Sequence, residues 1–452
     1  MNLKNGSKVA IIGGGPAGAM AGFFMLELAS RIGLHVTVDI YEARDFSKVG
    51  PSGCNMCAGV VSESLVQILA AEGINLPPTV VQRGIDSYVL HTSDLDPIAI
   101  RTPLDELRIA TVYRGGGPRR PSAIEEWSSF DRYLLNLAQE RGASIHPQRV
   151  VRLDWDNQHP RVTCRDLPST TYDLLIGAVG VNSGTLHLFE EMGFSFKAPQ
   201  VSKGFLSELH LGADLVQQYM GNSMHIFLLD IPGLKFAAMI PKVEYVTVCL
   251  LGEDINKDMV NRFMNAPEVR SCLPQQFDWC LNNSHCALVG PACHCAPKLN
   301  TGPSIQPYHD RVVLVGDCAV SRLYKDGIGA AYVTAKSAVV TAIFFGIASK
   351  DFAAQYRPVF ERINYDNRFG RFIFLVTVFY QKWRFLRHGM ARMVHSEQLQ
   401  QPQQRLMSRA LWDTFTGSTT YIDIFLRAIH PRFLFRLIWA TLLAVLQPKR
   451  KS

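Results

Sequence analysis

Hydrophobic positions near the start of the chain follow the pattern of a buried strand that runs directly into a helix. Residues 8–12 (Lys-Val-Ala-Ile-Ile) are nearly all apolar, which is typical of a strand covered on both faces in a parallel sheet. The segment from Ala17 to Ile32 is rich in Ala, Met, Leu and Phe and predicts a helix. A second strand is predicted from Leu34 to Tyr41, so the chain begins with a strand–helix–strand unit.

Glycines separate the first strand from its helix in a Gly-x-Gly-x-x-Gly pattern at residues 13–18. Gly13 permits a tight turn, Gly15 lets the backbone approach a pyrophosphate, and Gly18 lets the helix pack closely on the strand. The phosphates would lie at the helix N-terminus, where free N–H groups and the helix dipole favour an anion. Glu42 directly follows the second strand, where a carboxylate can bond a ribose 2′-hydroxyl. These residues predict a dinucleotide site.

Later apolar runs predict that the same sheet continues. Residues 172–183 form a predicted buried strand that ends in a glycine turn. Residues 311–317 form another, which ends in an acidic residue, and residues 327–338 after it predict a helix with small residues at its start. The nucleotide-binding strands are therefore discontinuous in the sequence.

The regions between these strands have other patterns. Residues 143–146 and 150–154 predict strands that return to the first sheet. Residues 200–255 alternate apolar and polar positions, as antiparallel strands do, within an insert at about 185–300. Residues 88–125 contain short strand-like runs and predict a loop-rich excursion.

Three separated motifs, spread over residues 8–338, resemble those of the large flavoproteins with two dinucleotide-binding domains. This group holds aromatic hydroxylases, flavin halogenases and geranylgeranyl reductases. The glycine turn and Glu42 are similar to the family's motif for the pyrophosphate and ribose of FAD. Residues 173–183 are similar to its central Asp-x-x-x-Gly-Ala-Asp-Gly-x-x-Ser motif, with Val179 where the family usually has aspartate.

The resemblance implies that the cofactor is FAD. Residues 314–317 with Gly327 and Gly329 are similar to the second FAD motif of the family, in which Asp317 would bond the ribitol. The glycine-flanked helix start would face the pyrimidine end of the flavin. The implied cofactor-binding residues are Gly13, Gly15, Pro16, Ala17, Gly18, Glu42, Val151, Gly316, Asp317, Gly327, Ile328 and Gly329.

The implied fold class is α/β. It comprises a Rossmann-like FAD-binding domain of the glutathione-reductase type, an inserted, mostly antiparallel β substrate domain and a helical C-terminal segment. The expected boundaries are 1–184 and 300–350 for the discontinuous FAD-binding domain, 185–299 for the substrate domain and 351–452 for the basic, apolar helical region.

Two further stretches bear on the subfamily. Residues 53–59 (Gly-Cys-Asn-Met-Cys-Ala-Gly) are similar to the cysteine–glycine element with which the geranylgeranyl reductase-like branch approaches the flavin ring. Residues 233–241 keep the Ile-Pro end of the halogenase Trp-x-Trp-x-Ile-Pro motif without either tryptophan. They also depart from the aromatic Tyr-x-Trp-x-Phe-Pro stretch of the reductase branch. The resemblance therefore does not decide whether the substrate carries a prenyl group.

Cysteines supply the candidate reactive groups, because Cys54, Cys57, Cys293 and Cys295 would each approach the catalytic region of this fold. A thiolate beside a flavin and helix N-termini would have a lowered pKa and could relay electrons. Structural cysteines, and a zinc or iron–sulfur site, are the alternatives. Cys-x-Cys is uncommon for zinc and ferredoxin-like spacing is absent, so no metal is predicted. The predicted catalytic residues are Cys54, Cys57 and His294, the last as a proton donor.

Charge is distributed unevenly along the 452 residues, whose formal net charge is +7. Residues 361–452 hold 15 Lys and Arg against 5 Asp and Glu, a net charge of +10. This segment also contains apolar runs at 372–380 and 433–446, each followed by basic residues, and neither approaches the roughly 20 residues of a spanning helix. No nucleic-acid-binding motif accompanies the charge, so an anionic membrane surface is the expected partner and core helices are the alternative.

The N-terminal residues do not have the pattern of an export signal, so we expect a cytoplasmic protein, peripheral on the inner face of the membrane, with thiols rather than disulfides. The function that fits these features is an FAD-dependent oxidoreductase that reduces a double bond of an apolar, isoprenoid or lipid-like substrate. NAD(P)H or a ferredoxin-type protein would supply the electrons. The alternatives are an FAD-dependent monooxygenase acting on an apolar substrate, and a membrane-associated flavoprotein that passes electrons to quinone.

Overall fold

The chain forms two compact units, each assembled from three separate segments. The computed structural model describes residues 1–50, 52–102, 109–118, 128–165, 167–277, 279, 290–398 and 400–446. The basic residues Lys449, Arg450 and Lys451 lie outside the described residues. Unit 1 comprises residues 1–55, 113–202 and 298–365, and unit 2 comprises residues 56–112, 203–297 and 366–452.

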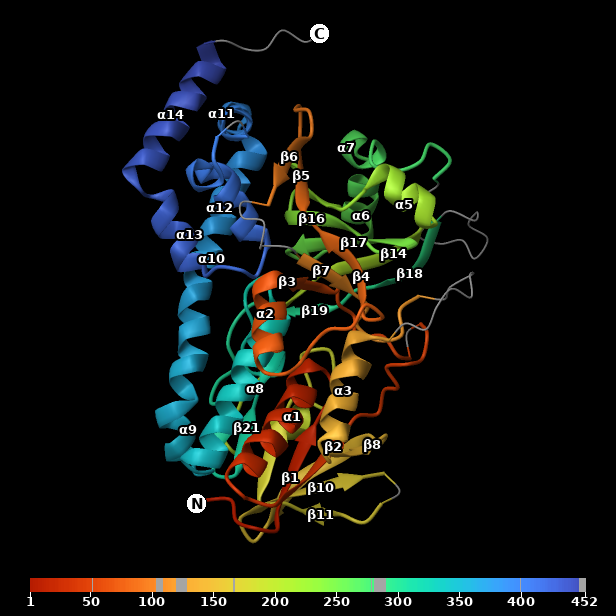
Figure 1. Ribbon diagram of the computed structural model, residues 1–452, viewed down its shortest axis with the longest axis vertical. Helices are drawn as coiled ribbons and strands as arrows, with labels where there is room; N and C mark the ends of the chain where they lie inside the picture. Colours follow the sequence, from red (N-terminus) through yellow and green to blue (C-terminus); the bar gives the residue numbers. More distant parts are fainter. Residues whose placement is uncertain are drawn as a thin grey trace. The chain divides into compact units, whose positions relative to one another are not determined.

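A six-stranded sheet with the strand order β20-β21-β12-β1-β2-β8 forms the centre of unit 1 (Figure 1). Its strands pair in parallel apart from the antiparallel β20–β21 edge. The apolar run at residues 9–11 is fully buried in β1, as expected for a central parallel strand whose side chains face covered layers on both sides of the sheet. The strands are β1 (Ser7–Ile12), β2 (Val36–Tyr41), β8 (Ser144–His146), β12 (Leu174–Gly177), β20 (Tyr308–His309) and β21 (Val312–Leu314).

Helix α1 (Pro16–Arg31) packs against both α3 and α8 (Figure 1). Its residues from Pro16 to Met25 are all buried, which explains why this segment is apolar on every side. The other helices of unit 1 are α3 (Phe130–Glu140), α4 (His187–Glu191), α8 (Gly327–Phe344) and α9 (Ser349–Gln355), with a 3₁₀ turn at Gly316–Cys318.

Residues 150–154 do not return to the first sheet, contrary to the prediction. They belong to β9 (Val150–Asp156), which pairs antiparallel with β10 (His159–Cys164), and β11 (Thr170–Thr171) adds to β10. Asn157 and Gln158 link β9 to β10 with positive φ angles of 47° and 72°. Two successive positive φ angles are what a tight hairpin turn requires, so the chain folds back on itself here.

A seven-stranded sheet with the order β18-β14-β17-β16-β15-β5-β6 forms the centre of unit 2. Its pairs are antiparallel except for β15–β5, which is parallel. The strands are β5 (Ser87–Thr92), β6 (Ile98–Arg101), β14 (Phe205–His210), β15 (Ser223–Leu228), β16 (Leu234–Pro241), β17 (Tyr245–Gly252) and β18 (Gly290–Cys295).

Residues 56–112 belong to unit 2, which differs from the predicted boundaries and from the prediction of a loop-rich excursion. β5 and β6 extend the seven-stranded sheet, because Ser87 of β5 pairs with Ser223 of β15, 136 positions further along the chain. A separate three-stranded sheet contains β3 (Val60–Ser62), β4 (Val81–Ile85) and β7 (Ile109–Val112). Short strands β13 (Val201–Lys203) and β19 (Lys298–Asn300) lie where the chain crosses between the units.

The two faces of the seven-stranded sheet have different covers. On one, here called the α6 face, Phe227, Met239 and Val248 form a buried core with residues of α6 and α7. On the other, the α10 face, Phe236 stacks on Phe374 of α10, with ring centroids 5.6 Å apart. The helices of unit 2 are α2 (Glu63–Ala71), α5 (Ala213–Tyr219), α6 (Lys257–Met264), α7 (Pro267–Arg270), α11 (Arg384–Glu397), α12 (Leu406–Phe415), α13 (Tyr421–Ala428) and α14 (Pro431–Leu446), with a 3₁₀ turn at Pro402–Gln404. Helix α10 (Arg357–Lys382) enters the unit from unit 1.

Trp412 tests whether the C-terminal helices belong to the core of unit 2. Its ring is fully buried and stacks on Tyr88 of β5, with ring centroids 4.5 Å apart. Trp412→Ala is expected to lower the free energy of unfolding by about 3–5 kcal/mol through the cavity it leaves. Chemical denaturation followed by far-UV circular dichroism measures the change.

The matched control is Trp383→Ala, because Trp383 lies in the same C-terminal segment but is 50% exposed. The free energy of unfolding of that variant should lie within about 0.5 kcal/mol of the parent's. Equal effects of the two substitutions would contradict the assignment of α12 to the core.

Candidate functional site

The predicted nucleotide-binding residues lie at one edge of the six-stranded sheet of unit 1. Gly13 follows β1, Glu42 follows β2, and one residue separates Gly316 from the end of β21. These strands are parallel and belong to the same sheet, so their carboxyl ends meet at the same edge. Ligands of open parallel sheets bind at this edge, outside the strand ends.

The first glycine turn brings backbone segments together more closely than any side chain allows. Gly13 has a φ angle of 103°, and a Cβ on it would lie 2.5 Å from the carbonyl oxygen of Ala178. A Cβ on Gly18 would overlap the carbonyl oxygen of Gly13. Gly15 is the N-cap of α1 and supplies no side-chain acceptor, and the first turn has no acidic residue. The first N–H groups of α1 are therefore available to an anion.

Glu42 is held against this turn by two main-chain hydrogen bonds. Its carboxylate accepts from the N–H of Gly14 and from the N–H of Arg44, each at 2.9 Å. Glu42 is 7% exposed, so the carboxylate lies at the sheet edge with little water around it. A carboxylate in this position can still accept from ribose hydroxyls.

Asp317 and the start of α8 form the other side of the site. Burial raises the pKa of Asp317, while a hydrogen bond from Ser321 and the charge of Arg114 act in the opposite direction. A Cβ on Gly327 would lie 3.7 Å from Oδ1 of Asp317, so the helix begins directly beside this carboxyl group. The predicted pairing of Asp317 with a glycine-flanked helix start is present in the structure.

Gly329 has a local role in addition to its predicted one. Asp326 is the N-cap of α8 and accepts from the N–H of Gly329 at 3.2 Å. A Cβ on Gly329 would overlap Oδ2 of Asp326, so a side chain here would displace the capping carboxylate. Gly327 and Ile328 form the first turn of α8, where backbone N–H groups have no acceptor within the helix.

A polar network beside Gly15 was not predicted from the sequence. Arg114 forms a salt bridge with the buried Asp131 at 2.7 Å, and Asn55 donates to the same carboxylate at 2.7 Å. Arg44 donates to Oδ1 of Asn55 at 3.1 Å. A Cβ on Gly15 would lie 3.3 Å from Nδ2 of Asn55, so the network reaches the turn. Two guanidinium groups beside free helix N–H groups are suited to a pyrophosphate.

The glycine-rich residues 114–117 hold the segment around Cys54 in place. The N–H of Asn55 donates to the carbonyl of Arg114, and the N–H of Gly50 donates to that of Gly117. A Cβ on Gly115 would overlap the carbonyl oxygen of Gly53. The repeated glycines therefore reflect a close backbone contact, whose partner segment the sequence does not identify.

The thiols predicted to be catalytic are distributed over both units. Cys54 belongs to unit 1, whereas Cys57 belongs to unit 2, and both are partly exposed. Within unit 2, burial raises the pKa of Cys249, and the nearby Cys57 and Cys295 raise it further. Cys249, which was not predicted, thus lies near Cys57 and Cys295. The catalytic roles of Cys54 and Cys57 stay predictions.

His294 does not share a face with its neighbouring cysteines. In the β14–β18 register, Cys295 pairs with Leu206, which also pairs with Cys249 of the α10 face. His294 points to the opposite face, because successive residues of a strand alternate. There it stacks on Phe205, with ring centroids 6.2 Å apart. His294 and the thiols of Cys249 and Cys295 therefore lie on opposite faces of the sheet, and the catalytic role of His294 stays a prediction.

A buried ion pair lies on the α10 face near the thiols. Nζ of Lys242 is 2.8 Å from Oε1 of Glu208, and the Lys242 side chain is only 1% exposed. Thr247 donates to the same carboxylate at 2.9 Å. Glu208 pairs with Cys293 in the β14–β18 register, so this charged group and the thiols occupy the same part of the sheet. The α10 face therefore carries a buried, hydrogen-bonded charge pair.

Two histidines and a cysteine converge on the α6 face. Nε2 of His91 is 3.0 Å from Nδ1 of His225, which is 3.3 Å from Sγ of Cys272. Burial lowers the pKa of His91 to about 3, helped by His225, and lowers the pKa of His225 to about 4. Both imidazoles are therefore neutral near pH 7. Two neutral imidazoles and a thiol are also a donor set that Zn²⁺ accepts, which was not predicted because these residues are far apart in the chain.

The comparisons with known proteins agree with this architecture. No protein-family model matches the chain. Salicylate hydroxylase of Pseudomonas putida is 24% identical over 369 residues, which are 73% of this chain and 75% of that protein. A geranylgeranyl bacteriochlorophyll reductase-like protein from Thermoplasma acidophilum has a TM-score of 0.62 at 15% identity, covering 97% of this chain and 100% of that one. A triple mutant of a flavin-dependent brominase has a TM-score of 0.58 at 14% identity, covering 92% and 97%.

The chain therefore has the fold of FAD-dependent oxidoreductases, which confirms the predicted fold class. The residues at the sheet edge fit FAD as well. The glycine turn offers free helix N–H groups, Glu42 lies where a ribose is bound, and Asp317 lies beside the second helix start. Val151 is an exposed residue near the start of β9, and its predicted contact with the cofactor stays a prediction.

Glu42 provides a test of the nucleotide site. Glu42→Gln replaces a charged acceptor of main-chain N–H groups with an amide, so we expect FAD to be retained about 10- to 100-fold more weakly. The flavin-to-protein absorbance ratio after dialysis, followed by titration with FAD, measures the affinity. Glu191→Gln, at a carboxylate that is 65% exposed in the same unit, should bind FAD like the parent.

The histidine pair predicts an acid-sensitive fold. The folded pKa values of about 3 and 4 lie below the usual 6.5, so the unfolded chain binds more protons in this range. This contribution to stability is fully present above pH 6.5 and falls with decreasing pH, by up to about 1.4 kcal/mol per pH unit for each histidine. Denaturation midpoints between pH 7 and pH 4 measure this slope.

The double variant His91→Gln, His225→Gln should flatten that slope, whereas His35→Gln at an exposed position should leave it unchanged. A slope equal to the parent's in the double variant would contradict the assignment. Metal analysis of the purified parent shows whether Zn²⁺ also occupies the group.

Proposed function

We propose that the protein is an FAD-dependent oxidoreductase that reduces a double bond of an apolar, isoprenoid or lipid-like substrate. The observation that carries the proposal is the composition of the α10 face over β14, β16, β17 and β18. It combines apolar side chains such as Leu206 and Ala238 with thiols and one buried ammonium group. The chain also shares its fold, over nearly its whole length, with a reductase-like protein.

In this proposal, unit 1 holds the cofactor. The N–H groups at the start of α1 and the guanidinium groups of Arg44 and Arg114 would hold the pyrophosphate. Glu42 would accept from the ribose, and Asp317 would accept from the ribitol. When bound, FAD supplies hydride transfer, and the protein supplies orientation and a dry site.

Reduction of a carbon–carbon double bond needs a proton as well as a hydride. Lys242 is a group on the α10 face that can hold this proton, since its ammonium is buried against Glu208, which also accepts from Thr247. Thr247 donates to that carboxylate and so orients it beside the ammonium group of Lys242. We propose either NAD(P)H or a ferredoxin-type protein as the electron donor.

A monooxygenase acting on an apolar substrate is the second candidate. The similarity to salicylate hydroxylase over three quarters of that protein favours it. The two candidates differ in how the reduced protein reacts with oxygen, and this difference can be measured without knowing the substrate.

The test begins with the protein purified with its flavin, reduced in the absence of oxygen. A reductase should be reoxidised slowly by air and quickly by a polyprenyl lipid extract, with a product two hydrogens heavier by mass spectrometry. Rapid oxygen-dependent consumption of NAD(P)H coupled to a product one oxygen heavier would instead establish the monooxygenase. Purification without bound flavin and failure to bind added FAD would exclude both.

Lys242 and Glu208 are tested as a pair, because removing one partner would leave the other charge buried and unpaired. The double variant Lys242→Met, Glu208→Gln should keep flavin binding and flavin reduction but slow product formation about 100-fold or more. Stopped-flow measurement of the two half-reactions separates these steps. The variant Lys235→Met, Glu253→Gln, at a more exposed ion pair, should leave both rates unchanged.

A further inference from the structure

Helix α14 carries apolar side chains on the face that it turns away from the protein. Its inner face packs against the protein, since Phe433 and Ala440 are buried and Thr441 lies against Gly389 of α11. The outer side chains are 42–75% exposed, and at roughly 100° per residue they fall within an arc of about 140°. They are Leu434, Phe435, Ile438, Trp439, Leu442, Val445 and Leu446.

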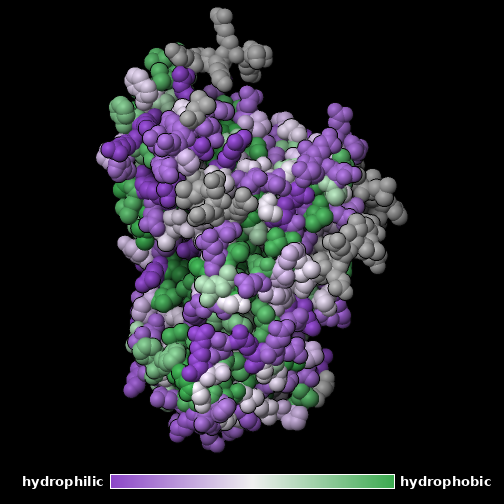
Figure 2. All heavy atoms as spheres, in the orientation of Figure 1, coloured by the Kyte–Doolittle hydropathy of each residue, from purple (hydrophilic) through white to green (hydrophobic). Residues whose placement is uncertain are grey.

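Further exposed apolar side chains lie on helices α10 and α13. Phe372, Leu375 and Phe379 of α10 recur at helical spacing and are 42–54% exposed. Trp383 follows at 50%, and Leu426 near the end of α13 is 55% exposed. Figure 2 shows hydrophobic side chains along the margin where Figure 1 places α13 and α14, interspersed with strongly hydrophilic ones. An extended apolar surface of this kind marks an interaction site.

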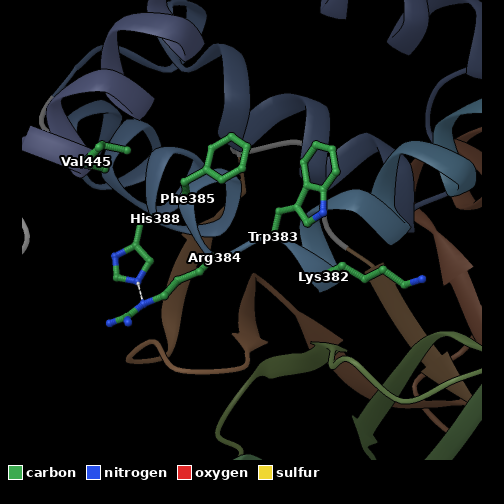
Figure 3. A pocket seen from close by; sticks show the side chains of 7 residues that line it. Lys382, Trp383, Arg384, Phe385, His388 and Val445 are labelled. Atoms are coloured by element: carbon green, nitrogen blue, oxygen red, sulfur yellow. Dashed lines mark hydrogen bonds between the residues drawn. The ribbon is translucent and has the colours of Figure 1, made fainter.

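A hollow of about 720 Å³ opens between α11 and α14 within this surface. Trp383, Phe385 and Val445 form its apolar lining, and the cationic side chains of Lys382 and Arg384 lie beside them (Figure 3). Nε of Arg384 donates to Nε2 of His388 at 3.3 Å (Figure 3). The hollow therefore combines apolar and cationic side chains.

Positive charge accompanies the apolar surface beyond the hollow. Arg432 and Arg436 of α14 are exposed and adjoin the apolar arc of that helix, at about 60° and about 100° from Phe435. Residues 361–452 hold the net charge of +10, while the remainder of the chain is slightly acidic. Apolar side chains bordered by Trp, Lys and Arg match the boundary between headgroups and acyl chains in an anionic bilayer.

Neither α14 alone nor the α13–α14 pair forms a straight helix of spanning length. α14 has 16 residues, about 24 Å of helix, which is shorter than the roughly 30 Å hydrocarbon core. α13 and α14 reach spanning length only together, and they are bent by 64° at their junction. In the described part of the chain, α8 alone passes the length and composition test singly, and 61% of it is buried in protein.

We infer that the outer faces of α14 and of the second half of α10 form a docking surface for an anionic lipid bilayer. The apolar arc enters the headgroup–acyl boundary, and Lys382, Arg384, Arg432 and Arg436 contact lipid phosphates. This inference depends on the surface of unit 2 and not on the reaction proposed above. The basic residues 449–451 add to the attraction by their charge.

The experiment is sedimentation of the full-length protein with vesicles of phosphatidylcholine containing phosphatidylserine, with pure phosphatidylcholine vesicles in parallel. The parent should bind the anionic vesicles more tightly and lose binding as salt is raised. Phe435→Ser, Trp439→Ser should weaken partitioning about tenfold or more, because two exposed aromatic side chains no longer enter the bilayer. Lys382→Gln, Arg384→Gln should reduce the preference for phosphatidylserine.

The controls make equivalent changes at exposed residues of unit 1. Phe344→Ser, Phe345→Ser replaces two aromatic side chains that are 52% and 51% exposed, and this variant should bind vesicles like the parent. Lys4→Gln, Lys350→Gln removes two exposed positive charges and should keep the parent's preference for phosphatidylserine. Circular dichroism and retained flavin confirm that each variant is folded.

Two outcomes would overturn the inference. One is vesicle binding by Phe435→Ser, Trp439→Ser that equals the parent's. The other is a parent that ignores vesicles but forms a concentration-dependent dimer in sedimentation velocity, abolished by the same two substitutions. That result would assign the surface to a second copy of the chain.

Discussion

The nucleotide edge of unit 1 depends on backbone contacts that leave no room for a side chain. A Cβ on Gly18 would overlap the carbonyl oxygen of Gly13, and one on Gly13 would lie 2.5 Å from the carbonyl oxygen of Ala178. These approaches set α1 directly against the turn after β1, so that its first N–H groups point out of the sheet edge. The positions of Glu42 and of the Arg114–Asp131 pair relative to this turn follow from the same packing.

The parts of this arrangement that could be predicted from the sequence are local. The glycine turn follows an apolar strand. Glu42 directly follows a second strand, and Asp317 comes shortly after a third. Because parallel strands end at one edge, strand-end residues can be placed without knowing the rest of the fold. Arg114 and Asp131 could not be placed in this way, since their salt bridge depends on a loop and a helix that no short pattern connects.

Long-range pairing limited the prediction in unit 2 as well. β5 lies in a segment predicted to be an excursion, because its partner β15 is far along the chain. The motif Cys293-His294-Cys295 looks like one reactive cluster in the sequence, but its residues alternate between two faces once β18 is a strand. His91, His225 and Cys272 show the converse, since distant residues without a shared motif converge in one core.

The composition of the C-terminal segment is compatible with core helices and with surface helices. The structure shows that the segment combines both roles. Trp412 and Phe374 are buried against the seven-stranded sheet, so these helices belong to the core of unit 2 on their inner side. The same segment exposes Phe435 and Trp439 on α14. Exposed apolar side chains on the outer face of a helix are more than its packing in the core requires, and they are typical of an interaction surface. The excess of apolar residues in this segment is therefore larger than the core of unit 2 accounts for.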